Sequence, residues 1–185
     1  MRPVSTITRT AEFGRRITLN FTIIPDTPVG PILLAGTENG LKHLRFCSSD
    51  NSAEAIQPAP DWQQNDRAFR EIADQLKAYF KKKLTSFTVR LDADGTDFQK
   101  KVWRALLKVP YGVTASYGEI AKAIGQPTAS RAVGMANGKN PISIIVPCHR
   151  IIGTNGQLVG YGGGLHNKMT LLQLENAVPK PLTAG

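Results

Sequence analysis

Residues 116–127 read SYGEIAKAIGQP, and they set the architecture of the second half of the chain. Ser116 and Glu119 have the spacing of a capping box, which marks the start of a helix. Gly125 is a natural C-terminal cap, and the proline that follows turns the chain. A second short helix is expected over about residues 128–137, so the stretch predicts a helix-turn-helix.

The second of these helices directs one basic side chain outward. Ala129, Val133 and Ala136 share one face, so Arg131, which lies about 200° from Val133, is expected on the opposite face. Gly134 lies beside Arg131 on this exposed side. A residue without a side chain lets a nucleic-acid backbone approach closely, although it equally permits contact between helices.

One more helix is expected before this motif. Asp97 is its predicted N-cap, apolar residues recur at helical spacing after it, and Pro110 ends it. Residues 92–96 read DADGT, which is typical of a linker. The chain then divides into domains 1–92 and 97–185, with the linker at 93–96.

The first 92 residues predict a small α/β domain. Period-two alternation marks strands at residues 17–24, 32–35 and 41–46, and a Glu38-Asn-Gly turn joins the last two as a hairpin. Residues 47–60 are rich in Ser, Ala and Pro and predict a loop. We therefore expect a small antiparallel sheet.

A helix and a further strand are expected to complete this domain. The apolar residues with helical spacing are Phe69, Ile72, Ala73, Leu76 and Phe80. The alternating residues of the further strand are Phe87, Val89 and Leu91. The C-terminal half, by contrast, predicts a mainly α domain.

Residues 141–153, PISIIVPCHRIIG, place a cysteine at the end of an apolar run. Cysteine attacks as the thiolate, and an adjacent imidazole or guanidinium lowers the thiol pKa from about 8.5. His149 and Arg150 directly follow Cys148, so the run predicts a nucleophile. The alternative is a buried cysteine that packs as a small hydrophobe. A metal site is disfavoured because the two cysteines and three histidines lack ligand spacing.

Composition and charge narrow the setting. With 41% hydrophobic residues among 185, the chain can bury a core. The two cysteines do not form a disulfide framework, which favours a reducing compartment. The N-terminus shows no apolar leader, and no stretch approaches the roughly 20 apolar residues that span a bilayer. We therefore expect a cytoplasmic protein without membrane contact. The net charge is +9, and the segment from Phe98 to Lys168 contains nine basic residues but only one acidic residue. This excess favours a polyanionic partner, although a solvated basic face is the alternative.

Residues 161–164, YGGG, lie between the cysteine and a final helix. Consecutive glycines are typical of a loop whose amides approach a ligand, or else of a flexible linker. Asn167 is the expected cap of the final helix. Glu175, near its end, either orients His149 or remains a surface carboxylate.

Together these motifs resemble the O6-alkylguanine-DNA alkyltransferases, or methylated-DNA-protein-cysteine methyltransferases. The resemblance is dense over residues 96–176 and looser over the first 92. It is carried by PCHR at 147–150, NP at 140–141, RAVG at 131–134, YGGG at 161–164 and LLQLE at 171–175. It implies a ribonuclease H-like N-terminal domain, a winged-helix-like C-terminal domain, direct DNA repair, and neither a cofactor nor a metal.

The resemblance also implies roles for five residues around the reaction. Cys148 takes the alkyl group from guanine O6 and keeps it, so each molecule acts once. His149 deprotonates the thiol through a bound water, and Glu175 holds the imidazole. Asn140 braces the turns of the site, and Tyr117 lends a proton to guanine N3 as negative charge develops.

A further set is implied to handle the DNA. Arg131 fills the stack after the damaged nucleotide rotates out through the minor groove. The other DNA-contacting positions are Ser130, Gly134 and Tyr117. The implied partner is double-stranded DNA that contains O6-alkylguanine, with O4-alkylthymine as a second substrate and self-association along DNA.

The pocket wall is implied to consist of Tyr161, Gly162, Gly163 and Ile151. The Gly162 amide would face O6, and the Ile151 carbonyl would accept a hydrogen bond from the exocyclic amine. Relatives often carry a small side chain where this chain has Gly162. Two other classes remain open: a helix-turn-helix regulator that binds DNA without consuming a thiol, and a cysteine hydrolase that turns over and ignores DNA.

Overall fold

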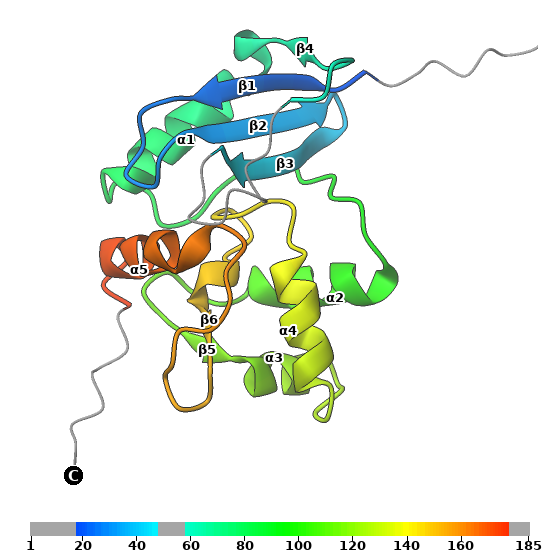
Figure 1. The fold of residues 1–185 in the computed structure, drawn as a ribbon, viewed down its shortest axis with the longest axis vertical. Helices are drawn as coiled ribbons and strands as arrows, with labels where there is room; N and C mark the ends of the chain where they lie inside the picture. The colour runs from blue at the N-terminus through cyan, green and yellow to red at the C-terminus, as the bar shows by residue number, and fades with distance from the viewer. Residues whose placement is uncertain (1–17, 48–57, 178–185) are drawn as a thin grey trace, which may run out of the picture.

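The structure is a computed structural model that describes residues 18–47 and 58–177. A sheet with one helix forms the N-terminal half, and a group of helices forms the C-terminal half beneath it (Figure 1). Residue 17 of the first predicted strand and most of the predicted loop at 47–60 lie outside the described residues.

The N-terminal sheet has the strand order β3-β2-β1-β4. Its strands are β1 (Asn20–Ile24), β2 (Ile32–Thr37), β3 (Gly40–Phe46) and β4 (Gln63–Gln64). The first three strands pair antiparallel, so the predicted antiparallel sheet and its β2–β3 hairpin are confirmed. The two-residue strand β4, which runs parallel to β1, carries no apolar alternation and was not predicted.

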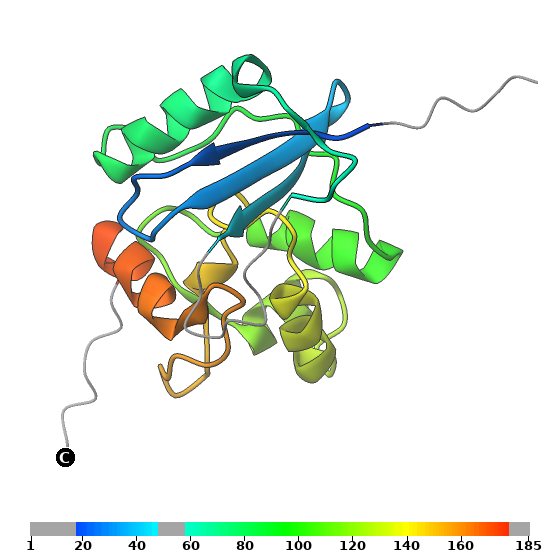
Figure 2. The ribbon, with the colours of Figure 1, turned by 45° about the horizontal axis from the view of Figure 1, so that its top comes forward.

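One helix covers a face of this sheet (Figure 2). It consists of a 3-10 turn, η2 (Asp66–Phe69), followed by α1 (Arg70–Phe80). Phe69 and Leu76 face the core, which confirms the predicted helix. Tyr79 is fully buried on the same helix, although the apolar spacing did not single it out.

The predicted strand at residues 87–91 is wrong. Only Leu91 forms a bridge to the sheet, with Leu41 of β3. Thr88 is held by α1 instead, because its amide donates to Gln75 Oε1 (2.9 Å) and its hydroxyl accepts from Gln75 Nε2 (3.1 Å). A backbone amide committed to a side chain cannot extend a ladder of strand hydrogen bonds.

The C-terminal domain is mainly helical, as predicted. Its helices are α2 (Asp97–Leu106), α3 (Tyr117–Ala123), α4 (Ser130–Gly138) and α5 (Gly164–Leu174), with a 3-10 turn η3 (Cys148–Arg150) and a parallel pair of short strands, β5 (Ala115–Ser116) and β6 (Ile151–Ile152). The capping box begins α3, and α3 and α4 form the predicted helix-turn-helix. Gly125 has φ +73°, as a C-terminal cap requires.

Two predicted caps are wrong. Thr96, and not Asp97, caps α2, because Thr96 Oγ1 accepts from Gln99 N while Gln99 Oε1 accepts from Thr96 N. Asp97 is the first helical residue, where its charge suits the helix dipole. Asn167 does not cap α5, since Gly163 occupies that position and Asn167 is buried one turn further on.

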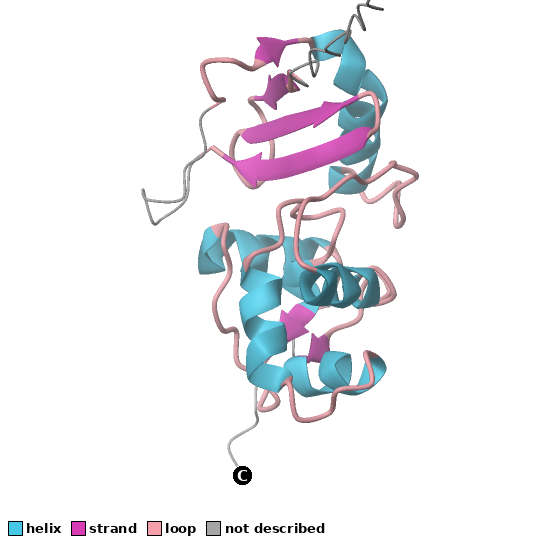
Figure 3. Ribbon diagram, turned by 90° about the vertical axis from the view of Figure 1, so that its right-hand side faces the viewer, coloured by secondary structure: helices cyan, strands magenta, loops and turns pink. Residues whose placement is uncertain are grey.

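The edge of the sheet carries the segment that leads to Cys148. Leu44 N donates to Pro141 O (3.0 Å), and Ser143 N donates to Leu44 O (3.0 Å). Leu44 and Ile142 therefore form a parallel bridge where β3 meets the helical domain (Figures 1 and 3). One hydrophobic core cluster runs through both halves of the molecule. The position of Cys148 thus depends on both domains.

Candidate active site

Cys148 begins η3 and is 4% exposed. Asn140 Nδ2 donates to Cys148 Sγ (3.0 Å) and to Val146 O (2.9 Å), while Asn140 Oδ1 accepts from Ile142 N (3.0 Å). One amide side chain therefore ties the start of the apolar run to its end and to the sulfur. The run between them includes Ile144, whose φ of 68° is rare for a β-branched residue and needs such support.

The Cys148 thiol is protonated in the resting site. Burial raises its pKa, while the hydrogen bond from Asn140 and the positive charge of Lys168 act in the opposite direction. The expectation that Arg150 lowers the thiol pKa is wrong, because its guanidinium binds Glu175 and Val109 O. Since only the thiolate attacks, this thiol needs a base.

His149 supplies a buried base next to the cysteine in sequence. It is fully buried, and its Nε2 lies 2.9 Å from Glu175 Oε1. Burial lowers the His149 pKa against the raising effect of Glu175, so the ring is neutral at neutral pH. With Nε2–H donated to the carboxylate, Nδ1 carries the free lone pair. Nδ1 has no hydrogen-bond partner within residues 18–47 and 58–177.

Glu175 caps α5 and is a buried hub rather than a surface carboxylate. Its Oε1 accepts from His149 Nε2, Arg150 Nη2 (2.9 Å) and Tyr79 Oη (2.6 Å). Its Oε2 accepts from Arg150 Nε (2.8 Å) and Gly112 N (3.4 Å). Burial alone would raise the Glu175 pKa, but these hydrogen bonds and charges lower it to about 2.

Lys168 is a functional candidate that the sequence analysis missed. Its ammonium group is fully buried on α5 and donates to Ile151 O (2.5 Å) and Val159 O (3.1 Å). Burial lowers its pKa to about 8, while the negative charge of a Cys148 thiolate acts to raise it. The sequence carried no local signal for this role, because the burial of Lys168 depends on acceptors that lie elsewhere in the chain.

The predicted pocket wall is only partly as expected. Tyr161 packs against Phe46 of β3 (ring centroids 5.9 Å apart), and burial with the charge of Cys148 raises its pKa. A Cβ on Gly163 would lie 2.3 Å from the Phe46 ring, so only glycine fits there. The Ile151 carbonyl already accepts from Lys168. Gly162 is half-buried beside these residues.

The helix-turn-helix brings the predicted DNA residues together with the site. Arg131 is exposed on α4, and Ser130 begins that helix. A Cβ on Gly134 would meet the Tyr117 ring at 3.7 Å, so the bare helix surface adjoins the phenol. Burial and the charge of Cys148 raise the Tyr117 pKa, which keeps its proton available. Tyr117 therefore links the outer face of α4 to the thiol.

The basic excess of this domain lies mostly on its surface. The exposed members between Phe98 and Lys168 are Lys100, Lys101, Arg104, Lys108, Lys122, Arg131 and Lys139. Arg150 and Lys168 are buried and belong to the site. The surface charge available to a polyanion is smaller than the sequence count, but its sign is unchanged.

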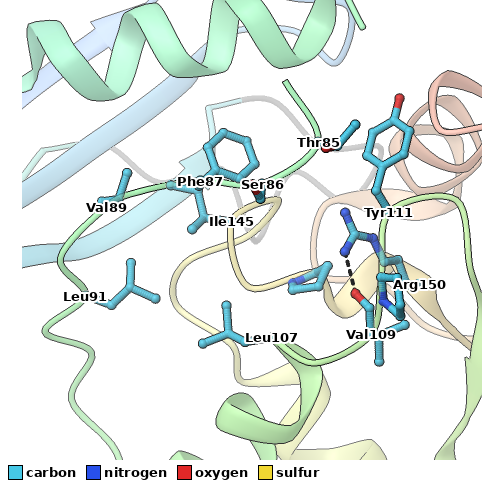
Figure 4. Close-up of a pocket in the computed structure, with 12 residues that line it drawn as sticks. Thr85, Ser86, Phe87, Val89, Leu91, Leu107, Val109, Tyr111, Ile145 and Arg150 are labelled. Carbon is cyan, nitrogen blue, oxygen red and sulfur yellow. Dashed lines mark hydrogen bonds between the residues drawn. The ribbon is translucent and has the colours of Figure 1, made fainter. Parts of the chain in front are cut away.

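A cavity of about 620 Å³ lies between the domains on the Arg150 side of the site (Figure 4). Phe87, Val89 and Leu91 line one wall, and Arg150 donates to Val109 O at one end. Its lining includes Pro147 but not Cys148. This cavity is therefore distinct from the surroundings of the thiol.

No group of three His, Cys, Asp or Glu side chains within residues 18–47 and 58–177 could hold a metal ion. No helix in the part of the chain that the structure describes is long and apolar enough to cross a bilayer.

Family models match both halves of the chain. Residues 20–93 match the ribonuclease-like domain of 6-O-methylguanine DNA methyltransferase, and residues 97–177 match its DNA binding domain. The chain belongs to this family. It is therefore a DNA-repair enzyme, a methyltransferase that binds DNA, with a ribonuclease-like N-terminal domain and a helical C-terminal domain.

Individual relatives agree with this membership. A methylated-DNA–protein-cysteine methyltransferase of Methanosarcina acetivorans is 56% identical, with 82% of this chain and 96% of that protein covered. One of Mycobacterium leprae is 52% identical over 81% of this chain and 88% of its own length. The crystal structure of Mycobacterium tuberculosis OGT in complex with DNA is 50% identical, with a TM-score of 0.76 over 87% of this chain and 94% of that one.

Proposed function

We propose that this chain repairs O6-alkylguanine in double-stranded DNA by moving the alkyl group to Cys148 Sγ, once per molecule. The observation that supports this most is the buried His149–Glu175 pair directly after a cysteine whose sulfur accepts a hydrogen bond from Asn140. The thiol lies in a helix-turn-helix domain. A cysteine hydrolase that ignores DNA does not require the exposed Arg131, and a regulator that only binds DNA does not require a buried base beside the thiol.

The first step of the reaction is the removal of the Cys148 thiol proton. His149 Nδ1 takes the Cys148 proton through a bound water, and Glu175 stabilises the imidazolium that forms. Burial, which raises the thiol pKa, makes this step the demanding one. The positive charge of Lys168 and the amide of Asn140 favour the thiolate once it exists.

The transfer is a displacement at the alkyl carbon. A carbon–sulfur bond forms while the bond between carbon and guanine O6 breaks, and its electron pair moves to the purine. Tyr117, which keeps its proton at neutral pH because burial and the charge of Cys148 raise its pKa, donates that proton to guanine N3 only as negative charge develops on the leaving base. The thioether is stable, so the protein is spent.

The guanine must leave the duplex to reach a buried sulfur. Rotation of the nucleotide costs a few kcal/mol, and the Arg131 side chain fills the space that it leaves. Ser130 and Gly134 let α4 approach the minor groove, where readout is largely independent of sequence. The exposed cations on the same domain neutralise phosphates.

Further details extend this proposal. O4-alkylthymine presents the same alkyl–oxygen bond and is a second substrate. We also propose self-association along DNA and action in the cytoplasm, at the nucleoid if the source is bacterial.

The test is a titration of active protein with excess duplex that contains O6-methylguanine. Repaired lesions should stop at one per molecule. Continued turnover would indicate the hydrolase class, and binding without any repair would indicate the regulator class.

A further inference from the structure

The N-terminal domain contributes one hydrogen bond to the proton relay. Tyr79, on α1, lies across the domain boundary from Glu175, at the end of α5. Its hydroxyl donates to Glu175 Oε1 at 2.6 Å, and both side chains are buried. The same oxygen accepts from His149 Nε2, so the phenol and the imidazole share one acceptor atom.

The Tyr79 ring is held so that its hydroxyl stays on Glu175. Its centroid lies 5.4 Å from that of Phe80, 5.3 Å from that of Phe87 and 6.1 Å from that of Tyr111. Burial, followed by the negative charge of Glu175, raises the Tyr79 pKa far above its ordinary value. The phenol is therefore a permanent donor and never a base at physiological pH.

A third donor on Oε1 has a chemical consequence for His149. A carboxylate oxygen that already accepts from Arg150 and Tyr79 has less negative charge to offer an imidazolium. Removal of the Tyr79 donor leaves Oε1 more basic, which favours the protonated imidazole. The charged and titratable groups around His149 are Glu175 and Lys168 of α5, Cys148 and Arg150 of η3, Tyr79 of α1, and Tyr111 of the segment after α2.

We propose that Tyr79 is a positioning residue through which the ribonuclease-like domain sets the orientation and proton affinity of His149. The proposal rests on the proposed function, since it assigns His149 as the base. It gives the N-terminal domain a part in the chemistry, beyond support for the sheet edge that carries residues 141–143.

The experiment compares Tyr79→Phe with Tyr111→Phe in the full-length protein. Both changes keep the ring and remove one hydroxyl, but the Tyr111 hydroxyl donates to Leu174 O (3.2 Å) and not to the relay. The readouts are the His149 pKa, from imidazole ¹⁵N NMR, and the rate of single-turnover transfer from free O6-benzylguanine across pH 5 to 9.

Tyr79→Phe should raise the His149 pKa and move the acid limb of the rate profile to higher pH. On that limb, where more of His149 is protonated and cannot act as a base, transfer should slow by about threefold to tenfold. Tyr111→Phe should change neither pKa nor limb. An unchanged His149 pKa in Tyr79→Phe, or equal changes in both variants, would overturn the proposal. Absence of transfer in the unmodified protein would instead refute the proposed function, because the NMR titration does not depend on it.

A second replacement keeps the test decisive if Tyr79→Phe folds poorly. Incorporation of 3-fluorotyrosine at position 79 keeps the ring and the hydroxyl but makes the phenol a stronger donor. The His149 pKa should then fall, opposite to the change in Tyr79→Phe. A rise, or no change, would contradict the proposal.

Discussion

Arg150 and Glu175 meet as a two-point ion pair, with Nε 2.8 Å from Oε2 and Nη2 2.9 Å from Oε1. Both side chains are buried, and the Arg150 guanidinium also donates to Val109 O. The arginine next to the nucleophile therefore acts on the carboxylate that orients the base. It stabilises a charge that burial would otherwise make costly.

Arg150→Met should destabilise the fold by about 3 kcal/mol or more, because it leaves the Glu175 carboxylate buried without its two-point guanidinium partner. Chemical denaturation measures the change. Lys77→Met is the matched control, since the Lys77–Asp74 pair is exposed and pairs of this kind contribute little. Similar losses in the two variants would refute the role of the buried pair.

The Glu175 pKa predicts acid sensitivity of the fold. Its folded value of about 2 lies below the unfolded value of about 4.3, so Glu175 stabilises the fold above the unfolded value. This contribution is lost as pH falls from about 5 toward 2. Glu175→Gln should flatten the stability profile over that window, whereas Glu38→Gln, in an exposed turn, should not. Parallel profiles for wild type and Glu175→Gln would contradict this.

His149→Ala should slow transfer from free O6-benzylguanine by about 10²-fold or more at neutral pH, because the buried thiol loses its base. The remaining rate should rise with pH as the thiol itself ionises. His166→Ala, an exposed histidine on α5, is the control. A wild-type rate at pH 7 in His149→Ala would exclude the relay.

Arg131→Ala should impair repair of duplex DNA much more than reaction with free O6-benzylguanine, which needs no nucleotide rotation. Lys122→Ala, an exposed cation on α3, should weaken duplex binding without this selective loss of repair at saturating protein. Equal losses on both substrates in Arg131→Ala would indicate a damaged active site and not the loss of a side chain that fills the vacated stack.

The features that the sequence predicted correctly depend on residues close together in the chain. The capping box at Ser116, the positive φ at Gly125 and the hairpin turn before Gly40 act over a few residues, and all appear in the structure. Asp97 does not cap α2, because the Thr96 side chain, one residue earlier, makes the capping box, and α5 begins after Gly163, four residues before Asn167.

The rest depends on partners that lie far apart in sequence. Tyr79 and Glu175 are 96 residues apart, and no spacing rule relates them. Arg150 lies two residues after Cys148 in the chain, yet the turn of η3 directs its guanidinium to Glu175. Lys168 lies in a helix whose apolar residues marked the core, and its burial becomes evident only once Ile151 and Val159 supply its acceptors.

Alkyl transfer to Cys148 is tested most simply by mass spectrometry of the protein after incubation with duplex DNA that contains O6-methylguanine. We predict a gain of one methyl group per molecule, located on Cys148 by peptide mapping, retained in Cys47→Ser and absent in Cys148→Ser. Cys148→Ser should still fold and bind the duplex. A methyl group on Cys47, or repair by Cys148→Ser, would show that Cys148 is not the alkyl acceptor.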